Sequence, residues 1–349
     1  MAMKVNRAFS EFFNDVVNIS KIESDNAKKS RDYLISQIVN ISNNGKFLRL
    51  ASQYNCFFGS FSRKTKVCVL NDVDLIIGLN GCDLLCEGYK WDKITLKLKK
   101  NCSDKRLINL SDNISMFSWQ EPDYELNSNK VKNNLVSELK NISQYEKAEI
   151  HARGEAITLK LKSYAWNFDI VPAFYYEENN KSYFIIPNGN GKWKKTNPII
   201  EQKRIANANS KFNNTVLQTV RLVKYWNMRG RMPNITSYVL ETMVLDYFDS
   251  AKHYCINQDG STTDYPNVHF RDALYYISNN IYSNVYDSKG IQGNINDLSL
   301  NEKNRIHQRA KTDYEKAKNA VNAEINEKNH QKSINIWRDI FGEEFPKYE

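Results

Sequence analysis

Two carboxylates occupy alternate positions in an apolar stretch. Asp72 and Asp74 lie two residues apart in residues 71–77, which are rich in valine, leucine and isoleucine. Successive side chains of a β-strand point to opposite faces, so both carboxylates would share one face, with Val73 and Leu75 on the other. Such a pair is repulsive unless a divalent cation such as Mg²⁺, which prefers oxygen ligands, lies between them. By itself the pair is also compatible with a solvated strand end.

Two further features of the sequence could complete a site for chemistry on phosphate groups. Gly59 lets the backbone approach a phosphate closely, and Ser60 adds a hydroxyl and an N–H. Asp169 lies in the apolar stretch 166–174, where a lone carboxylate is unfavourable unless it has a partner or a function. The alternation over residues 155–162 predicts a strand antiparallel to 167–174, and we expect this pair to bring Asp169 beside the other two carboxylates.

These residues carry a family resemblance. Gly59-Ser60 followed twelve residues later by Asp72-x-Asp74 resembles the nucleotidyltransferases built on a polymerase-β-like core, which require a third carboxylate on a neighbouring strand. The Asp-Ile-Val-Pro-Ala-Phe stretch that begins at Asp169 is similar to that strand in the bacterial CD-NTases. These are cyclic-oligonucleotide synthases related to cyclic GMP-AMP synthase and oligoadenylate synthase.

The resemblance extends over nearly the whole chain. Residues 193–198, Trp-Lys-Lys-Thr-Asn-Pro, look like the bridge between lobes in this family. Lys224, on a predicted helix, and Ser237, at the start of the next, match residues that contact the triphosphate in the family, and Tyr238 matches an aromatic residue that can stack on a base. From spacing alone, Lys224 could equally be a surface lysine and Tyr238 a core residue. The stretch 334–346 resembles a C-terminal family signature.

The expected fold class is α+β. The family implies a polymerase-β-like nucleotidyltransferase core, with a mixed or antiparallel sheet and helices, joined to a C-terminal helical lobe. We expect residues 1–200 to form the core lobe with an N-terminal helical scaffold, and residues 201–349 to form the helical lobe that closes the active-site cleft. Residues 107–130 look loop-like because they are rich in serine, aspartate and asparagine.

The amino-acid composition and net charge of the chain indicate which kinds of molecule it binds. The 349 residues are 41% hydrophobic and 26% charged, as in an ordinary globular protein, with a formal net charge of +9. This charge favours polyanions such as nucleoside triphosphates, nucleic acid or acidic lipid. The lysine-rich residues 81–106 are either a solvated strand face or a polyanion-binding patch. With no apolar stretch of about 18 residues and no signal-peptide pattern, we expect a cytoplasmic protein without a membrane partner, and its six cysteines to be free thiols.

The resemblance implies a specific chemistry. Two Mg²⁺ ions (Mn²⁺ is an alternative) would bind Asp72, Asp74 and Asp169, with ATP and other nucleoside triphosphates as substrates. The product would be a cyclic di- or trinucleotide, a second messenger for antiphage signalling that acts through a downstream effector. Some relatives also need an activating, peptide-binding partner protein. The sequence gives neither the bases, nor the ring size, nor the linkage.

Two other classes of function remain open at this level. A nucleotidyltransferase that acts on a macromolecule, by tailing RNA or tRNA or by nucleotidylating a protein, would share every core motif. A basic nucleic-acid-binding scaffold that is not an enzyme would be expected to have lost at least one of the three carboxylates, and all three are present.

Overall fold

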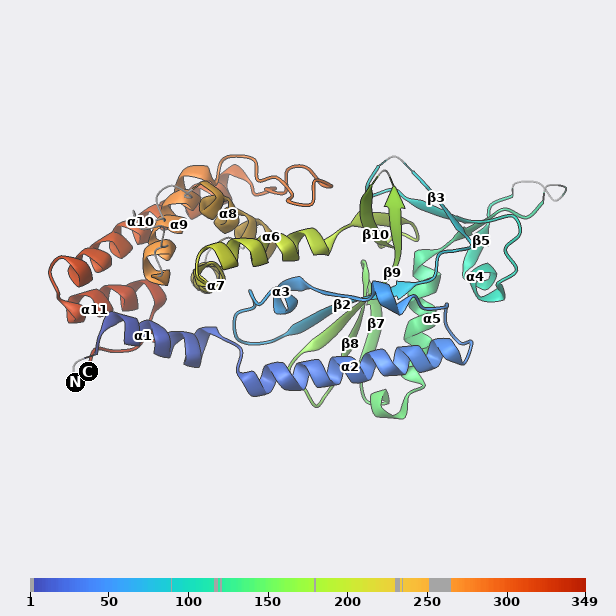
Figure 1. Ribbon diagram of the computed structural model, residues 1–349, viewed down its shortest axis with the longest axis horizontal. Coiled ribbons are helices and arrows are strands. Elements are labelled where there is room, and N and C mark those ends of the chain that lie inside the picture. The colour runs from blue at the N-terminus through green and yellow to red at the C-terminus, as the bar shows by residue number, and fades with distance from the viewer. Residues whose placement is uncertain are drawn as a thin grey trace. The chain divides into compact units, whose positions relative to one another are not determined.

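The chain divides into two compact units. The computed structural model in Figure 1 describes residues 3–88, 90–115, 119, 121–178, 180–229, 233, 235–250 and 265–349. Lys21–Ser62 and Leu70–Ile200 form one unit, which we call the core unit. Met1–Ser20, Arg63–Val69 and Glu201–Glu349 form the other, which we call the helical unit.

The main sheet of the core unit is mixed. Its strand order is β1-β2-β9-β10-β11, and β8 pairs with β9 and β7 with β8. β2 and β9 are parallel, whereas the pairs β1–β2, β8–β9 and β9–β10 are antiparallel, so the predicted antiparallel pair over residues 155–174 is confirmed. The bounds are β1 Cys56–Phe58, β2 Asp72–Leu79, β7 Glu149–Arg153, β8 Ala156–Lys160, β9 Asn167–Glu178, β10 Lys181–Pro187 and β11 Trp193–Thr196.

Helices cover this sheet. α5 (Ser128–Lys140) packs on β7, β8 and β10. α2 (Lys21–Asn43) runs alongside the strands in Figure 1, and the guanidinium of Arg31 lies 3.6 Å from the ring centre of Phe57 in β1. The core unit also contains the short helices η2 (Ser52–Tyr54), α3 (Gly59–Ser62), α4 (Lys105–Asn109) and η3 (Ser143–Tyr145).

A second sheet lies in residues 84–126. Its order is β3-β4-β6-β5, with bounds β3 Leu84–Glu87, β4 Thr95–Leu98, β5 Ser111–Asn113 and β6 Tyr124–Leu126. Alternate residues of the lysine-rich stretch are buried as the alternation predicted, with Ile94, Leu96 and Leu98 at most 7% exposed. The prediction of a loop over 107–130 holds for the described residues between β5 and β6 and is wrong for the rest, because β5, β6 and the start of α5 lie there. Strands of three residues are too short to show a period.

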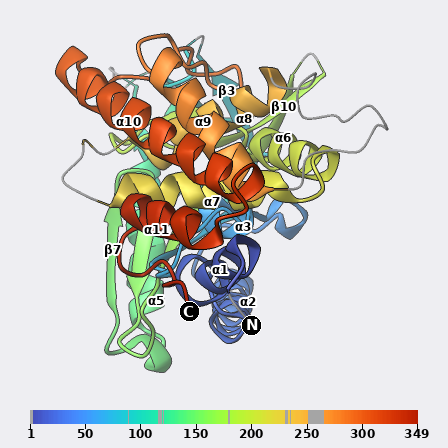
Figure 2. The ribbon, with the colours of Figure 1, turned by 90° about the vertical axis from the view of Figure 1, so that its left-hand side faces the viewer.

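The helical unit has an aromatic core. Phe9 and Phe12 of α1 pack against Trp337 and Phe341 of α11 and against Phe345. In Figure 2 the helices α1 and α11 face the viewer. The C-terminal stretch 334–346 is thus docked against α1. The bounds are α1 Val5–Phe12, the π-helix η1 Phe13–Val17, α6 Pro198–Lys211, α7 Thr215–Met228, α8 Ser237–Ser250, α9 Pro266–Asn280, α10 Leu300–Ile325 and α11 His330–Phe341.

This packing changes the division of the chain expected from the sequence. Residues 1–20 were expected in the core lobe, but the apolar face of α1 is buried in the aromatic core of the helical unit. Arg63–Val69 also groups with these helices, because Val67 is buried in the same core. A change of unit within such a short stretch leaves no mark on hydrophobic periodicity.

Two further sequence expectations concern membranes and thiols. Among the described residues, no helix is both long and apolar enough to cross a bilayer. Cys56, Cys68, Cys82, Cys86 and Cys102 are free thiols, and Cys255 lies outside the described residues.

Candidate active site

The three carboxylates lie on one face of the main sheet. Asp74 of β2 is the direct partner of Asp169 of β9 across the parallel pair, and Asp72 is the partner of Asn167. Partners in adjacent strands point to the same face and lie about 5 Å apart. Val73 and Leu75 are buried on the opposite face, at 1% and 0% exposure, whereas all three aspartates are half-buried. The geometry therefore agrees with the arrangement expected from the sequence.

The carboxylate face is polar at one end and apolar at the other. Two positions after Asp74 and Asp169 come Ile76 and Val171, which belong to a small apolar cluster with Phe184. Low-dielectric surroundings strengthen any electrostatic interaction of nearby groups with a charged ligand. The aspartates therefore lie at the boundary between the buried apolar part and the solvent-accessible part of this sheet face, which suits binding of a charged substrate.

Gly59 lies directly against Asp74. It is the first residue of α3, it has a φ of +71°, and a β-carbon added to it would lie 1.7 Å from Oδ2 of Asp74. Both the backbone angle and the available space therefore require glycine here. Ser60 follows as the second residue of α3 and is half-buried. The predicted turn and the predicted carboxylates are thus brought together within the core unit.

Thr158 is a site residue that the sequence analysis missed. It is the antiparallel partner of Asp169 in β8, and its hydroxyl donates a hydrogen bond of 2.8 Å to Oδ1 of Asp169. Asp169 therefore lies between Asp74 on one side and Thr158 on the other. The strand register was the signal that could have revealed it, because the predicted pairing of 155–162 with 167–174 leaves only a few residues that could lie opposite Asp169.

The donor set fits a divalent metal that shares its ligands with a substrate. Carboxylate oxygens on one face are suitable ligands for Mg²⁺, which usually binds through one or two carboxylates plus substrate phosphates rather than in an all-protein cage. Within the described part of the chain no three histidine, cysteine, aspartate or glutamate side chains are gathered closely enough to hold a metal ion by themselves.

The remaining predicted residues belong to the helical unit. Ser237 is the first residue of α8 and is exposed, and Tyr238 follows it and is half-buried. The hydroxyl of Tyr238 donates to Asp287, and the ammonium of Lys289 lies 4.2 Å from its ring centre. Burial, followed by the hydrogen bond to Asp287, raises the pKa of Tyr238 well above its usual value. Tyr238 is therefore held by its neighbours as a neutral phenol.

Lys224 is buried in α7 rather than exposed on its surface. Its side chain is 7% exposed, and its ammonium donates to Glu241 of α8 and, at 3.2 Å, to the carbonyl oxygen of Thr65. Burial would raise the pKa of Glu241, but the charges of Arg63 and Lys224 outweigh it and hold this pKa below its usual value. Lys224 and Glu241 thus form an ion pair.

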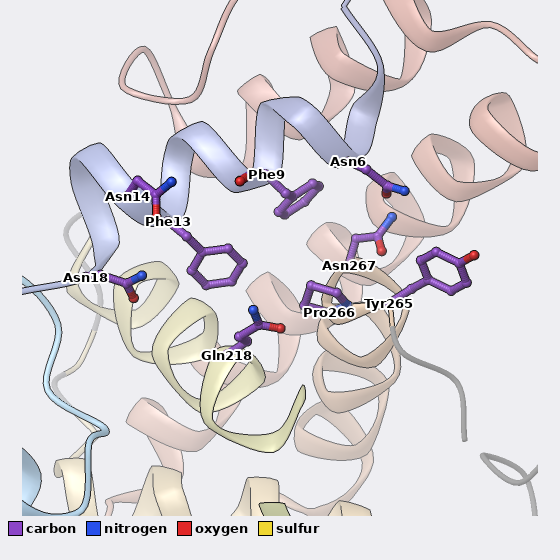
Figure 3. A pocket seen from close by; sticks show the side chains of 10 residues that line it. Asn6, Phe9, Phe13, Asn14, Asn18, Gln218, Tyr265, Pro266 and Asn267 are labelled. Atoms are coloured by element: carbon purple, nitrogen blue, oxygen red, sulfur yellow. The ribbon is translucent and has the colours of Figure 1, made fainter. Parts of the chain in front are cut away.

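A pocket of about 300 Å³ lies elsewhere in the helical unit. Figure 3 shows its lining, in which the amides of Asn14 and Gln218 accompany the rings of Phe9 and Phe13. It contains none of the residues predicted to bind metal or nucleotide.

Comparison with known proteins decides the family. No family model matches the sequence. A curated protein of Bacillus cereus (strain VD146), described as a probable cyclic nucleotide synthase, is 36% identical over the full length of both chains. The chain belongs to the CD-NTase family. It is therefore a nucleotidyltransferase of the cyclic nucleotide synthase type, as the resemblance implied.

Solved structures share the fold of this CD-NTase. CdnC of Escherichia coli MS115-1, solved with ATP, has a TM-score of 0.63 at 16% identity, with 99% of each chain covered. The same protein has also been solved in complex with a HORMA protein. DncV of Vibrio cholerae, described as a cyclic AMP-GMP synthase and a prokaryotic cGAS homolog, has a TM-score of 0.61 at 10% identity, with 95% of this chain and 93% of DncV covered. The α+β core with a C-terminal helical unit is thus the fold of this family.

Proposed function

We propose that this CD-NTase joins nucleoside triphosphates into a cyclic di- or trinucleotide, with Asp72, Asp74 and Asp169 as its catalytic carboxylates. The observation that carries the proposal is the register that pairs Asp74 with Asp169 and leaves Asp72 on the same face. The relative from B. cereus and the ATP bound to CdnC support a nucleotide substrate.

The three carboxylates would hold two Mg²⁺ ions together with the triphosphate. When bound, such ions neutralise charge on the phosphates and acidify the acceptor hydroxyl. Asp72 and Asp74 follow the phosphate turn closely in sequence and would serve the triphosphate. Asp169 would serve the acceptor.

The reaction is an in-line displacement. The 3′- or 2′-hydroxyl oxygen of one nucleotide forms a bond to the α-phosphorus of another, the bond from that phosphorus to the β-phosphate oxygen breaks, and pyrophosphate leaves. Asp169 accepts the hydroxyl proton and passes it to solvent. The same transfer is then repeated, and the last one, between the two ends of the linear product, closes the ring. The contribution of the protein is mostly positioning and charge stabilisation.

The surrounding residues orient these groups. The hydrogen bond from Thr158 fixes one oxygen of Asp169, so that the other faces the acceptor. Gly59 and Ser60 would donate backbone and hydroxyl hydrogen bonds to the β- and γ-phosphates. Ser237 would donate from the exposed start of α8, and Tyr238 would stack on a base. A triphosphate contact from Lys224 requires its ammonium to exchange Thr65 for a phosphate oxygen while it keeps Glu241.

The biological role follows from the family. The product would be a second messenger for antiphage signalling that acts on a separate effector. Because CdnC has been solved in complex with a HORMA protein, a peptide-binding partner that switches the synthase on is a reasonable regulator for this chain as well.

The test is an incubation of purified protein with labelled ATP, GTP, CTP and UTP and Mg²⁺, followed by phosphatase and mass spectrometry. A small phosphatase-resistant product, lost in Asp74→Asn but kept in Asp25→Asn, is the expected result. Asp25 is a matched control because it lies on the exposed surface of α2 in the same unit. If the label is instead transferred to added tRNA or protein, the enzyme acts on a macromolecule and does not make a cyclic product. Full activity of Asp74→Asn would overturn the catalytic assignment.

A further inference from the structure

Buried charged groups form a continuous chain through the helical unit. Its order is Lys224, Glu241, Arg63, Glu201 and Lys289, and cations alternate with carboxylates throughout. These side chains come from α7, α8, α6, the stretch Arg63–Val69 and the loop after α9. All are between 4% and 13% exposed.

Glu241 is the hub at one end of this chain. Its Oε2 accepts from Nε of Arg63 at 3.0 Å, and its Oε1 accepts from the hydroxyl of Thr65 at 3.0 Å and from Lys224. Glu241 therefore joins α7 and α8 to the stretch that contains Arg63. Because Lys224 and Glu241 are 17 residues apart while Arg63 is 178 residues from Glu241, the third member of this hub is far from the other two in sequence.

Arg63 connects Glu241 to the other end of this network of ion pairs. Its Nη1 donates to Oε2 of Glu201 at 2.9 Å, and the second oxygen of Glu201 accepts from Lys289 at 2.7 Å. The ammonium of Lys289 lies over the ring of Tyr238, whose hydroxyl is bonded to Asp287. A single network thus connects two of the three side chains proposed to meet the nucleotide from this unit, Lys224 and Tyr238.

Stability is a poor explanation for such a network. Removing charges from water costs free energy, and buried ion pairs often give no more stability than well-packed apolar residues of similar size. A planar guanidinium holds its donors in a fixed fork and so sets the orientation of the carboxylates it binds, whereas the ammonium of a lysine is a rotatable point charge. The choice of arginine therefore points to a geometric role.

We propose that Arg63 is a positioning residue for nucleotide binding: through Glu241 and Glu201 it sets the side chains of Lys224 and Tyr238. Arg63 follows Ser62 directly in sequence and belongs to the helical unit, whereas the turn belongs to the core unit. This inference rests on the proposed function only in taking those residues as nucleotide contacts.

The test compares Arg63→Lys with Arg204→Met. Arg204 is a matched control because it also links α6 to α8 by ion pairs, with Asp246 at 2.6 Å and Asp249 at 2.9 Å, and has no part in the network. Each variant is assayed for kcat and KM, for calorimetric binding of α,β-methylene ATP with Mg²⁺, and for thermal unfolding. We expect Arg63→Lys to weaken binding about tenfold and to lower kcat/KM by about 10- to 100-fold, and Arg204→Met to change both less than twofold.

A second variant protects the test against misfolding. Glu201→Gln keeps the shape of the side chain and breaks the link at one point, and we expect weaker binding from it as well. Because Arg63 and Glu201 act in one network, the double variant should lose no more affinity than the worse of the single variants. Wild-type affinity in Arg63→Lys, or equal losses in Arg204→Met, would overturn the proposal. Since calorimetry does not depend on turnover, label transferred by the wild type to a macromolecule instead of a cyclic product would refute the proposed function and leave this test in place.

Discussion

A β-carbon on residue 59 would lie 1.7 Å from Oδ2 of Asp74, so the turn before β2 touches the carboxylate face with no space between them. The contact explains why a glycine precedes the serine at this point. It also makes the position of the Asp74 carboxylate sensitive to the smallest possible enlargement of residue 59.

Gly59→Ala should therefore lose activity and stability together. Gly45→Ala is its control, because Gly45 has almost the same backbone angle, a φ of +74° against +71°, but nothing within 4 Å of an added β-carbon. We expect Gly45→Ala to cost about 1 kcal/mol from backbone strain alone, and Gly59→Ala to cost about 3 kcal/mol and to lower product formation at least about 100-fold. Urea unfolding and product assays measure the two effects. Equal behaviour of the two variants would mean that the contact with Asp74 has no consequence.

Thr158→Val should slow the reaction with little effect on folding. The change keeps the shape of the side chain and removes the hydrogen bond to Oδ1 of Asp169. A hydrogen bond to a charged group is worth about 1.5–3 kcal/mol, and partial exposure of Asp169 places this one near the lower limit, so we expect about a tenfold loss of kcat. Thr158→Ser keeps the hydroxyl and should restore most of the rate. A Thr158→Val enzyme with the wild-type rate would show that Asp169 needs no orientation.

Removal of divalent metal should abolish turnover without unfolding the protein. EDTA-treated enzyme is expected to lose at least about 100-fold in rate, since the charge stabilisation supplied by such ions is worth several kcal/mol. Mg²⁺ in excess should restore it. The circular dichroism spectrum should not change, because the three carboxylates are held by strand register rather than by the ion. Undiminished activity in EDTA would exclude the proposed metal chemistry.

Acid should weaken the loop that follows α9. Burial would raise the pKa of Asp287, but hydrogen bonds from Tyr238 and from the N–H groups of Lys289 and Gln292 outweigh it and hold this pKa below its ordinary value of 3.8. The folded-state pKa is the lower one, so the stabilisation is complete above about pH 4 and is lost as pH falls through the folded pKa.

The corresponding variant is Asp287→Asn. We expect it to cost about 2 kcal/mol at pH 7, with the difference from wild type shrinking below pH 3.8. Urea unfolding at pH 7 and at pH 3 gives the two values. Asp297→Asn, on the same loop and exposed, should be neutral at both. A difference that does not depend on pH would show that the charge of Asp287 is not what stabilises the loop.

Strand periodicity together with the family resemblance predicted the carboxylate face. The alternation around Asp72 and Asp74 gave their common direction, and the apolar stretch around Asp169 gave the third strand. Sequence could not give the residues that hold these groups in place. Thr158 depends on the register between two strands, and Gly59 depends on a close approach in space, neither of which changes the local pattern of hydrophobicity.

The helical unit was harder to predict because its key contacts are distant in sequence. The sequence around Lys224 is compatible with a surface lysine or a phosphate-binding lysine, and nothing in it points to the ion pair with Glu241. Arg63 lies 138 residues from Glu201 and 178 from Glu241. A charged residue carries no sequence signal for such partners, whereas an apolar residue at helical spacing at least predicts a buried face.

The helical unit is built from segments that are far apart in the sequence, and this affects how it folds during translation. Phe9 and Phe12 are translated more than 300 residues before Trp337, Phe341 and Phe345, which pack against them. Until these residues have been added, about 15 to 60 s later at common elongation rates, the apolar face of α1 lacks part of its native cover. The nascent chain is therefore a natural client for chaperones that shield exposed aromatic side chains, and slow codons late in the message would lengthen the period in which it can aggregate.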